Sequence, residues 1–504
     1  MESRYGNSIR NIFTGVISKL FLSVLAFTAR TVFIQALGVE YNGINSLYSN
    51  ILSILSFSEL GIGNVLTFSL YEAFKEKDYQ RINALINYFR RIYYGVSCAI
   101  LAVGLMLIPI LKYIVNSNLP YREVYIYYVL YLINTVVSYL MVYKQTIIVA
   151  DQKGYISSIC DTTASFLMYI MQIVCLLVGH NFAAYLLIQL GCTLAKNLLI
   201  GIVSNCMYPY VNKSAAYVSK VERSLLIKNI ESTFVYKISE KMLNNTDNIL
   251  ISTIVGTVYV GYYSNYYTII MYIVAIIAVF INGFMASLGN LNAGKNKDSS
   301  FQMFNIFMLI FGFVGAVLAC CFTNCLQPFV KIWIGEQYVV PFIWVAAIVF
   351  NNYIDEIMNP VWIFRETMGL FQQVKYVMPI AAVLNFGLSA FWGMRWGVPG
   401  ILLATVTSKL ATQYWYEPML LYKRKFDQPL SGFYMLVFRN ILACVLALLL
   451  SFWACSYIGD TFPEIILRAI VSGGIAVLCV WLMYFRSNTW KELWRRYIVV
   501  LLKR

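Results

Sequence analysis

The sequence predicts an all-α, polytopic membrane protein with about fourteen transmembrane helices, and three observations lead to this fold class. First, 60% of the 504 residues are hydrophobic and only 12% are charged, whereas soluble domains are about one quarter charged. Second, apolar runs of about 20 residues, the length that crosses a bilayer, recur along the whole chain. Third, Lys and Arg gather in alternate connections between these runs. No stretch remains for a separate soluble domain.

The apolar runs give the expected spans in chain order. The first run contains Lys19 and Arg30, which the apolar region of a cleavable signal peptide would not carry, so we expect it to be retained. Each later run lies between polar or glycine-containing connections and has about the length that a bilayer requires. The expected spans are residues 9–38, 44–70, 92–115, 123–150, 155–179, 182–206, 232–256, 262–288, 301–323, 341–364, 376–396, 398–421, 433–456 and 463–485.

The net charge of +15 is explained by where the basic residues lie. In a soluble protein this charge would suggest a nucleic-acid partner, but cytoplasmic loops of membrane proteins collect Lys and Arg. With both termini inside, about 26 of the 38 basic residues fall on the cytoplasmic side, about 5 outside and about 7 within spans. We therefore expect cytoplasmic termini, a lipid bilayer as the surrounding partner, and no nucleic acid.

A short motif occurs twice, at an offset of 218 residues. Gly38-Val-Glu-Tyr-Asn-Gly43 is followed by a serine three residues later, and so is Gly256-Thr-Val-Tyr-Val-Gly261. Each copy lies at an expected outer connection, between the first two spans and between the seventh and eighth. The shared tyrosine and serine offsets favour an internal repeat over two unrelated tight turns. We therefore expect two pseudo-symmetric six-helix lobes, as in transporters built from repeats, plus two additional C-terminal helices.

This repeat divides the chain into five expected parts. The last of them places Trp490 and Trp494 opposite Lys491 at helical spacing, a pattern typical of a helix in the headgroup layer. The parts are an N-terminal six-helix lobe (1–206), a cytoplasmic linker between lobes (207–231), a C-terminal six-helix lobe (232–425), two additional transmembrane helices (426–486) and a basic amphipathic interfacial tail (487–504).

Basic residues inside the spans are the first functional candidates, because a charge in the bilayer core is expensive and generally faces a cavity or a partner. Lys19 and Arg30 are eleven residues apart and therefore lie nearly on one helix face, about 16 Å apart. Lys237 and Lys241 form a polar stripe with Asn244 and Asn248 on the seventh span. For any single lysine, the alternative is that its side chain extends to the interface. Further single cations are Lys144, Lys196 and Lys409.

Acidic residues inside the spans are fewer. We expect Glu240 to form a structural ion pair with Lys237 or Lys241. Glu59 and Asp247 have no obvious local partner. They can bind a coupling proton or sodium ion, or neutralise a lysine on another helix, and the sequence does not separate these alternatives.

Signals of an enzyme are weak. His180 is the only histidine, so a histidine-based metal site or acid–base relay cannot be built from the chain. The segment from Gly289 to Lys295 nearly matches a P-loop, but it lacks the final Ser or Thr and follows a membrane helix, so we expect a cytoplasmic turn there. We expect no enzyme activity, no metal and no cofactor.

Three motifs in order along the chain resemble one family. They are Arg30-Thr-Val-Phe-Ile-Gln-Ala-Leu-Gly38 with Tyr41 and Gly43 after it, Glu59-Leu-Gly-Ile-Gly63, and Thr246-Asp-Asn-Ile-Leu-Ile-Ser252 running to Gly256. With this order and spacing, the chain resembles lipid-linked oligosaccharide flippases, the polysaccharide and O-antigen exporters of the multidrug/oligosaccharidyl-lipid/polysaccharide (MOP) superfamily, nearly end to end.

The resemblance implies a flippase of a bacterial cytoplasmic membrane. It would move polyprenyl-diphosphate-linked oligosaccharides from the inner to the outer leaflet by alternating access, for cell-surface polysaccharide synthesis and beside other membrane proteins of polysaccharide assembly. Lys19, Arg30, Lys237 and Lys241 would hold the diphosphate through charge-assisted hydrogen bonds. Protons, sodium or the membrane potential would drive transport. The sugar repeat unit cannot be inferred.

Two other functions stay open. An ion-coupled drug or cation antiporter of the same fold would prefer acids in its cavity, and about seven intramembrane basic residues against five acids argue mildly against it. A membrane glycosyltransferase or polysaccharide polymerase would need a catalytic acid or base near a membrane face, and the sequence contains no convincing set of such residues.

Overall fold

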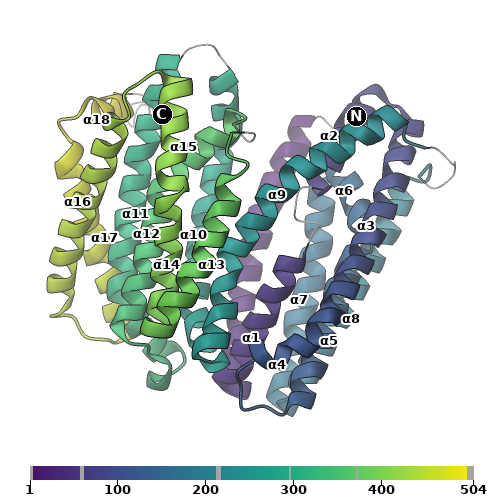
Figure 1. The fold of residues 1–504 in the computed structure, drawn as a ribbon, viewed down its shortest axis with the longest axis horizontal. Helices are drawn as coiled ribbons and strands as arrows, with labels where there is room; N and C mark the ends of the chain where they lie inside the picture. The colour runs from purple at the N-terminus through teal and green to yellow at the C-terminus, as the bar shows by residue number, and fades with distance from the viewer. Residues whose placement is uncertain (1–3, 57–61, 212–216, 294–296, 371–372, 496–504) are drawn as a thin grey trace. The chain divides into compact units, whose positions relative to one another are not determined.

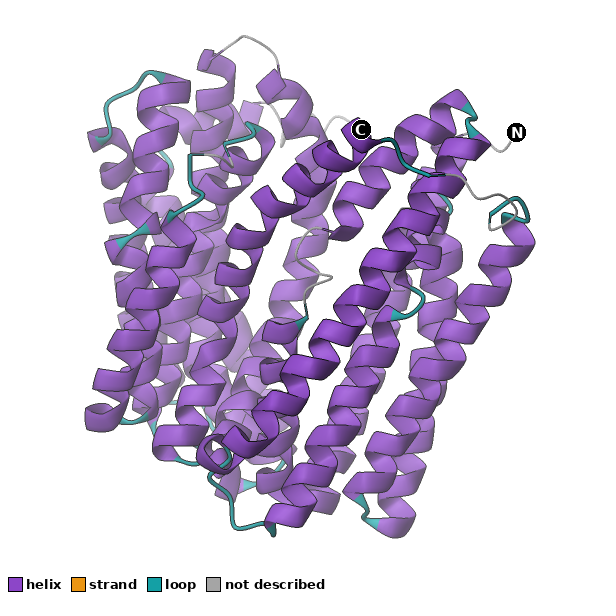
Figure 2. Cartoon of the chain, turned by 45° about the vertical axis from the view of Figure 1, so that its right-hand side comes forward, coloured by secondary structure: helices purple, strands orange, loops and turns teal. Residues whose placement is uncertain are grey.

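The computed structural model describes residues 4–56, 62–211, 217–293, 297–370 and 373–495, and helices account for most of them, with no strand in these ranges (Figures 1 and 2). This confirms the prediction of an all-α polytopic membrane protein. The chain forms two compact units, Met1–Gly261 and Tyr262–Arg504.

The first unit contains the helices from α1 to α9. Sequence signals mark several of their ends: the Asp78 side chain accepts a hydrogen bond from the Arg81 amide at the start of α3, and Asn181 does the same for Ala184 in α8. The helices are α1 (Arg4–Leu55), α2 (Ile62–Glu76), α3 (Tyr79–Leu107), the 3₁₀ turn η2 (Ile108–Ile110), α4 (Leu111–Ile114), α5 (Tyr121–Tyr139), α6 (Val142–Ala150), α7 (Gly154–Gly179), α8 (Phe182–Met207), α9 (Lys220–Leu250) and the π-helical turn η3 (Ile251–Val255).

An aromatic cluster helps to hold α1, α5 and α8 together. Phe182, at the start of α8, is 2% exposed and packs against Phe33 of α1 at 5.6 Å and Tyr127 of α5 at 4.7 Å between ring centroids. Tyr41 adds a further edge-to-face contact to Phe182 at 5.5 Å. Helix α1 also packs along α7 and α9 (Figure 1). Much of α1 therefore contributes to the core of the first unit.

The second unit contains the remaining helices, and α17 begins with a complete capping box formed by Thr461 and Glu464. Helix α10 (Thr257–Ala293) starts at the end of the first unit. The others are α11 (Lys297–Trp333), the 3₁₀ turn η4 (Glu336–Tyr338), α12 (Phe342–Thr367), α13 (Val377–Trp396), α14 (Val398–Ala411), α15 (Gln413–Leu421), the π-helical turn η5 (Tyr422–Phe426), α16 (Ser431–Cys455), α17 (Phe462–Tyr484) and α18 (Asn488–Leu493).

Helix α11 is the centre of the second unit, where it packs against α12, α16 and α17. Its buried Asn324 donates hydrogen bonds from one amide nitrogen to Ser451 of α16 at 3.1 Å and to Ser472 of α17 at 3.0 Å. Buried amides that find such partners stabilise a specific packing arrangement. The two helices expected as an addition are thus joined to α11 by polar contacts inside their apolar interface.

Ten helical runs in the described residues are long and apolar enough to cross a membrane. Nine of them correspond to one expected span each, and the run Phe21–Leu55 covers parts of the first two. The rest of the expected span 44–70, and the expected spans 232–256, 341–364 and 398–421, do not meet this measure. Helix α2 is short, and Thr412 interrupts the helix between α14 and α15. Helices α9 and α12 are long enough but carry several charged residues. Of these two charged helices, α9 carries the candidate site residues Lys237, Lys241 and Asp247.

Two local expectations differ from the structure, and a third falls partly outside the described residues. The predicted loop at 324–340 is helical as far as Trp333, because Leu326 and Val330 continue the buried face of α11. The turn predicted from Gly289 to Lys295 does not begin at Gly289, because α10 continues to Ala293, and residues 294–296 lie outside the described residues. Of the interfacial tail, α18 is described, and residues 496–504 lie outside the described residues.

The compact units are not the same divisions as the lobes inferred from the repeat. Helix α9 belongs to the first unit, where it packs against α1 and α2, and the boundary between the units falls inside α10. The lobes at 1–206 and 232–425, the linker and the additional helix pair stay predictions.

Candidate functional site

Both copies of the repeated motif begin with a backbone break at glycine. Gly38 has φ 86° and ψ −179° and interrupts α1, and Gly256 has φ 138° and ψ 150° and separates η3 from α10. Only glycine adopts this region of backbone conformation without strain. The structure thus places the two chain reversals at equivalent positions of the repeat. The expected turn from Gly38 to Gly43 is shorter than predicted, because helix resumes directly after Gly38.

The second glycines of the two copies lie against each other within the first unit. A Cβ atom on Gly43 would overlap the carbonyl oxygen of Thr257, and one on Gly261 would overlap the carbonyl oxygen of Val39. These two contacts are equivalent under the 218-residue offset. Asn42 adds a hydrogen bond from its side-chain amide to the Gly261 carbonyl at 3.0 Å. Small residues permit such close approach of two helix backbones.

The same offset relates two of the predicted diphosphate ligands, Lys19 and Lys237. Each lies 19 residues before the glycine break of its own copy, which is about 28 Å along a helix. Since the hydrocarbon core is about 30 Å thick, both lysines lie near the membrane boundary opposite the glycine breaks. Lys241 and Arg30 fall at intermediate positions, about 22 Å and about 12 Å from the breaks of their own helices.

The surroundings of these cations differ. Lys19 is exposed and Arg30 is half-buried on α1. Lys237 forms an ion pair with Glu240 at 2.8 Å, one of the two pairings expected for that glutamate. Lys241 approaches the Ser53 hydroxyl of α1 at 3.5 Å, so α9 and α1 meet at this residue. Lys241 therefore lies against the part of α1 that follows the Gly38 break.

The two other predicted cations of the first unit contact polar groups on neighbouring helices. Lys144 is 9% exposed and donates a hydrogen bond to the Asn205 side chain of α8 at 3.0 Å. Lys196 forms an ion pair with Asp161 of α7 at 2.8 Å, and both side chains are one-third exposed. Asp161 also accepts a hydrogen bond from Gln145 at 3.0 Å. These contacts join α6, α7 and α8.

The predicted cation Lys409 lies in the second unit, on α14. Its ammonium group forms an ion pair with Asp355 of α12 at 2.8 Å, and the Tyr414 hydroxyl also donates to Asp355. Glu356, the next residue, is 2% exposed and accepts a hydrogen bond from Asn359 at 2.9 Å. Helix α12 therefore carries one acid that is paired with a lysine, Asp355, and next to it a second acid that is buried, Glu356.

Sequence reasoning missed the most buried ion pair of the second unit. Arg365 of α12 donates two hydrogen bonds of 3.0 Å to Glu417 of α15, and the two side chains are 2% and 0% exposed. Both hydrogen bonds come from one guanidinium nitrogen, Nη1, which bridges the two carboxylate oxygens, and such charge-assisted bonds are stronger than neutral ones. The available signals were that Glu417 lies inside the expected span 398–421 and that Arg365 directly follows the expected span 341–364. Removing one partner would leave a buried charge, so this pair joins α12 to α15 tightly.

One of the two predicted ion-coupling acids, Asp247, lies among the described residues. Asp247 is 7% exposed on α9, nine residues before the Gly256 break. Glu59 lies outside the described residues. Neither assignment is tested by the structure, and both stay predictions.

An apolar pocket of about 330 Å³ lies in the second unit. Three helices, α11, α12 and α16, surround it. A pocket of this composition is suited to a hydrocarbon chain and offers few partners to a charged group. Its lining residues are Ala319, Thr323, Phe342, Ala346, Val349, Phe350, Tyr353, Leu448, Leu449 and Phe452.

Comparison with known proteins shows similarity in fold. No protein-family model matches the chain, and no curated protein matches it. An inward-facing multidrug resistance MATE family transporter of the MOP superfamily aligns with TM-score 0.66 and 10% identity, over 81% of this chain and 98% of that one. The lipid II flippase MurJ, in an inward closed conformation, aligns with TM-score 0.66 and 14% identity, over 93% and 98%.

A MOP superfamily transporter from Pyrococcus furiosus aligns with TM-score 0.57 and 12% identity, over 81% of this chain and 93% of that one. At such identities the similarity is one of architecture. The chain therefore has the polytopic fold seen in transporters of the MOP superfamily, and the substrate has to be argued from its own residues.

Proposed function

We propose that this protein is a flippase that moves polyprenyl-diphosphate-linked oligosaccharides from the inner to the outer leaflet by alternating access. The observation that carries the proposal is the series of cations on α1 and α9, at several depths of the membrane-spanning region. Lys19 and Lys237 occupy equivalent positions of the repeat, and Lys241 and Arg30 lie closer to the glycine breaks. A diphosphate that crosses the membrane needs positive partners along its path.

An apolar pocket supports the proposal for the lipid part of such a substrate. The apolar pocket between α11, α12 and α16 would accept part of an isoprenoid chain. Support also comes from the extent of the structural matches. The alignment with the lipid II flippase covers 93% of this chain, whereas the alignment with the MATE family transporter covers 81%. The difference between these two shares is about the length of a helix pair such as α16 and α17.

One observation favours a second candidate, an ion-coupled antiporter for drugs or cations. Glu356 is buried in α12 and has no basic partner among the described residues, which suits a carboxyl group that binds and releases a proton. The neighbouring Asp355 is instead balanced by Lys409. An antiporter would use Glu356 for its cation or proton, whereas the flippase would use the cations of α1 and α9.

The remaining expectations belong to this proposal. Glu59 and Asp247 are its candidates for coupling to protons or sodium, and the membrane potential is the alternative driving force. Lys144, Lys196 and Lys409 are proposed as secondary cations, each already engaged with the polar groups described above. The protein would lie in a bacterial cytoplasmic membrane with both termini inside, beside other proteins of polysaccharide assembly.

Thermal stabilisation of the purified protein separates the two candidates. We expect a polyprenyl-diphosphate-linked sugar to raise the melting temperature, and organic cations at matched concentration to leave it unchanged, because a ligand that binds the folded state stabilises it. The matched control is the polyprenyl alcohol, which keeps the chain and lacks the diphosphate. Stabilisation by organic cations alone would favour the antiporter and reject the flippase.

A further inference from the structure

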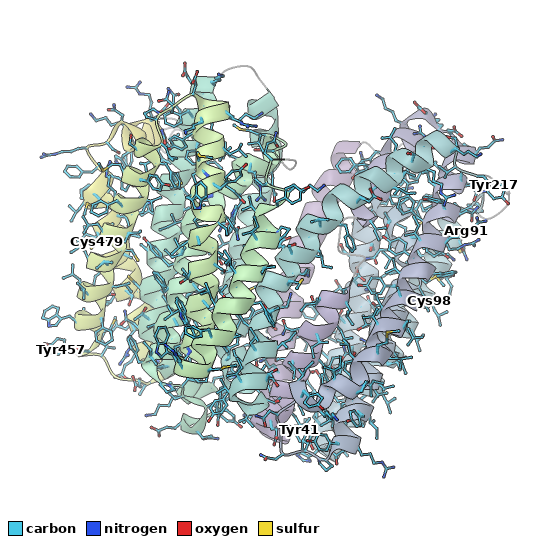
Figure 3. All side chains as sticks on the ribbon, in the orientation of Figure 1. Tyr41, Arg91, Cys98, Tyr217, Tyr457 and Cys479 are labelled. Atoms are coloured by element: carbon cyan, nitrogen blue, oxygen red, sulfur yellow. The ribbon has the colours of Figure 1, made fainter. Side chains whose placement is uncertain are left out.

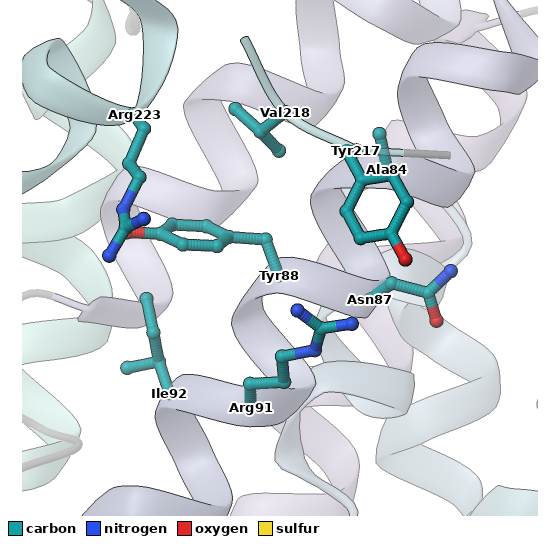
Figure 4. A pocket seen from close by; sticks show the side chains of 8 residues that line it. All are labelled: Ala84, Asn87, Tyr88, Arg91, Ile92, Tyr217, Val218 and Arg223. Atoms are coloured by element: carbon teal, nitrogen blue, oxygen red, sulfur yellow. The ribbon is translucent and has the colours of Figure 1, made fainter. Parts of the chain in front are cut away.

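A second pocket of about 330 Å³ lies in the first unit, where α3 meets the start of α9 (Figure 4). It contains two guanidinium groups, an amide and two tyrosine rings, and no carboxylate lines it among the described residues. The proposed diphosphate ligands Lys19, Arg30, Lys237 and Lys241 do not line it. Its lining residues are Ala84, Asn87, Tyr88, Arg91, Ile92, Tyr217, Val218 and Arg223.

Aromatic rings hold both arginines of the pocket. The Arg91 guanidinium carbon lies 5.7 Å from the ring centroid of Tyr217, and that of Arg223 lies 5.9 Å from Tyr88. Figure 4 shows the two guanidinium groups on either side of the Tyr88 side chain. A cation–π contact orients a guanidinium and leaves its N–H groups available to an acceptor. Among the described residues, neither arginine has a carboxylate within ion-pair distance.

The acid next to Arg223 is already engaged by another cation. Glu222 precedes Arg223 in α9, but its carboxylate pairs with Arg81 of α3 at 3.0 Å. This ion pair connects the start of α9 to the start of α3.

A second contact involves the segment that precedes the pocket, where Tyr210 packs against Tyr79 of α3 at 4.7 Å between ring centroids. Burial raises the pKa of Tyr210 to about 12, so its hydroxyl stays neutral at physiological pH.

The pocket lies at the edge of the apolar part of α3. Residues 92–111 contain no charged side chain, and their length of about 20 residues matches the hydrocarbon core. Arg91 directly precedes this run and is therefore at headgroup level. Figure 3 agrees, since Arg91 and Tyr217 lie at the end of the first unit opposite Tyr41, with Cys98 between. Tyr217 is 73% exposed, so the pocket is open to its surroundings.

We propose that this pocket binds the phosphate or diphosphate group of a membrane lipid. Two guanidinium groups can each bind phosphate oxygens through paired N–H donors, and the Tyr88 and Tyr217 hydroxyls can add further hydrogen bonds. The position at headgroup level lets a lipid present its phosphate while its chains remain in the bilayer. The proposal goes beyond the flippase function, because the pocket would recognise a phosphate group. Both a resident anionic phospholipid and a transported diphosphate lipid carry this group.

Titration of the purified full chain in detergent, followed by native mass spectrometry, tests this site. The probes are farnesyl diphosphate, dioctanoyl phosphatidylglycerol, inorganic pyrophosphate and dioctanoyl phosphatidylcholine. We expect at least one of the two anionic lipids to bind, and the double variant Arg91→Gln/Arg223→Gln to weaken that binding about tenfold or more. Preference for farnesyl diphosphate would identify a transported lipid as the source, and preference for phosphatidylglycerol a resident lipid.

The matched control is Arg122→Gln/Arg395→Gln, which removes the same charge from two exposed positions outside the pocket, one of them also an arginine over an aromatic ring. It should bind the anionic lipid as the unmodified protein does. A double variant with lysine at positions 91 and 223 should recover much of the affinity. Equal binding by all variants, equal binding of phosphatidylcholine, or binding of pyrophosphate alone would overturn the proposal.

A variant at the α1–α9 cations keeps this test separate from the proposed function. If Lys241→Gln abolishes binding of the anionic lipid and Arg91→Gln/Arg223→Gln does not, the pocket assignment is wrong and the flippase proposal stands. If the arginine variant loses binding and Lys241→Gln keeps it, the pocket binds a lipid phosphate whatever the protein transports.

Discussion

Replacing Gly43 or Gly261 with valine should abolish accumulation of folded protein in the membrane. The Cβ atom alone would overlap a backbone carbonyl oxygen of the other motif copy, Thr257 in one case and Val39 in the other. Rotation of a side chain cannot relieve an overlap with backbone, so two helices would have to separate. Overpacking a close contact typically costs about 1–3 kcal/mol, and here the hydrogen bond from Asn42 to Gly261 would also be lost.

The measurement is the yield of monodisperse protein after detergent extraction, for each variant against the unmodified chain. Gly95 and Gly191 provide matched controls, because each is a helical glycine with open space around the position of a Cβ atom. Alanine at either control should be neutral or stabilising by up to about 1 kcal/mol. Normal yields of Gly43→Val and Gly261→Val would show that the two motif copies do not pack as described.

Neutralising Arg30 or Lys241 should abolish export while the protein stays folded. Under the proposed function both side chains hold the diphosphate, and a hydrogen bond to a charged group contributes about 1.5–3 kcal/mol, so affinity should fall about 10- to 100-fold. The variants are Arg30→Ala and Lys241→Ala, and the dissociation constant for a polyprenyl-diphosphate-linked sugar is measured together with the melting temperature of the free protein.

Charge-conserving variants sharpen this prediction. Arg30→Lys and Lys241→Arg should retain much of the affinity, whereas a merely structural role would not depend on charge in this way. Lys112→Ala removes an exposed lysine of α4 and should have no effect. Unchanged affinity in both alanine variants would remove these residues from the diphosphate site.

The fold class could be predicted because composition and periodic apolar runs depend on the local chain alone. The repeat also placed the glycine breaks at Gly38 and Gly256, since chain reversal without strain requires glycine there. The same repeat could have revealed that Lys19 and Lys237 are equivalent. What sequence could not show is that Gly43 and Gly261 touch, because that depends on how distant helices pack.

The ion pairs illustrate the same limit. Arg365 and Glu417 lie on separate helices, 52 residues apart, and no local pattern connects them. Lys196 and Lys409 appeared in the sequence as single cations, but acids on neighbouring helices pair with both. Arg91 and Arg223 counted only as basic residues outside the spans, because the segments that form their pocket are far apart in the chain.

The most direct test of the proposed function is a leaflet-exchange assay with the purified full chain in proteoliposomes. A polyprenyl-diphosphate-linked oligosaccharide is placed in both leaflets, and its accessibility to an external glycan-modifying enzyme is followed over time. A flippase should raise accessibility beyond the outer-leaflet fraction, whereas empty liposomes should stay at that fraction. No increase, together with proton- or sodium-driven movement of an organic cation by the same preparation, would reject the flippase function.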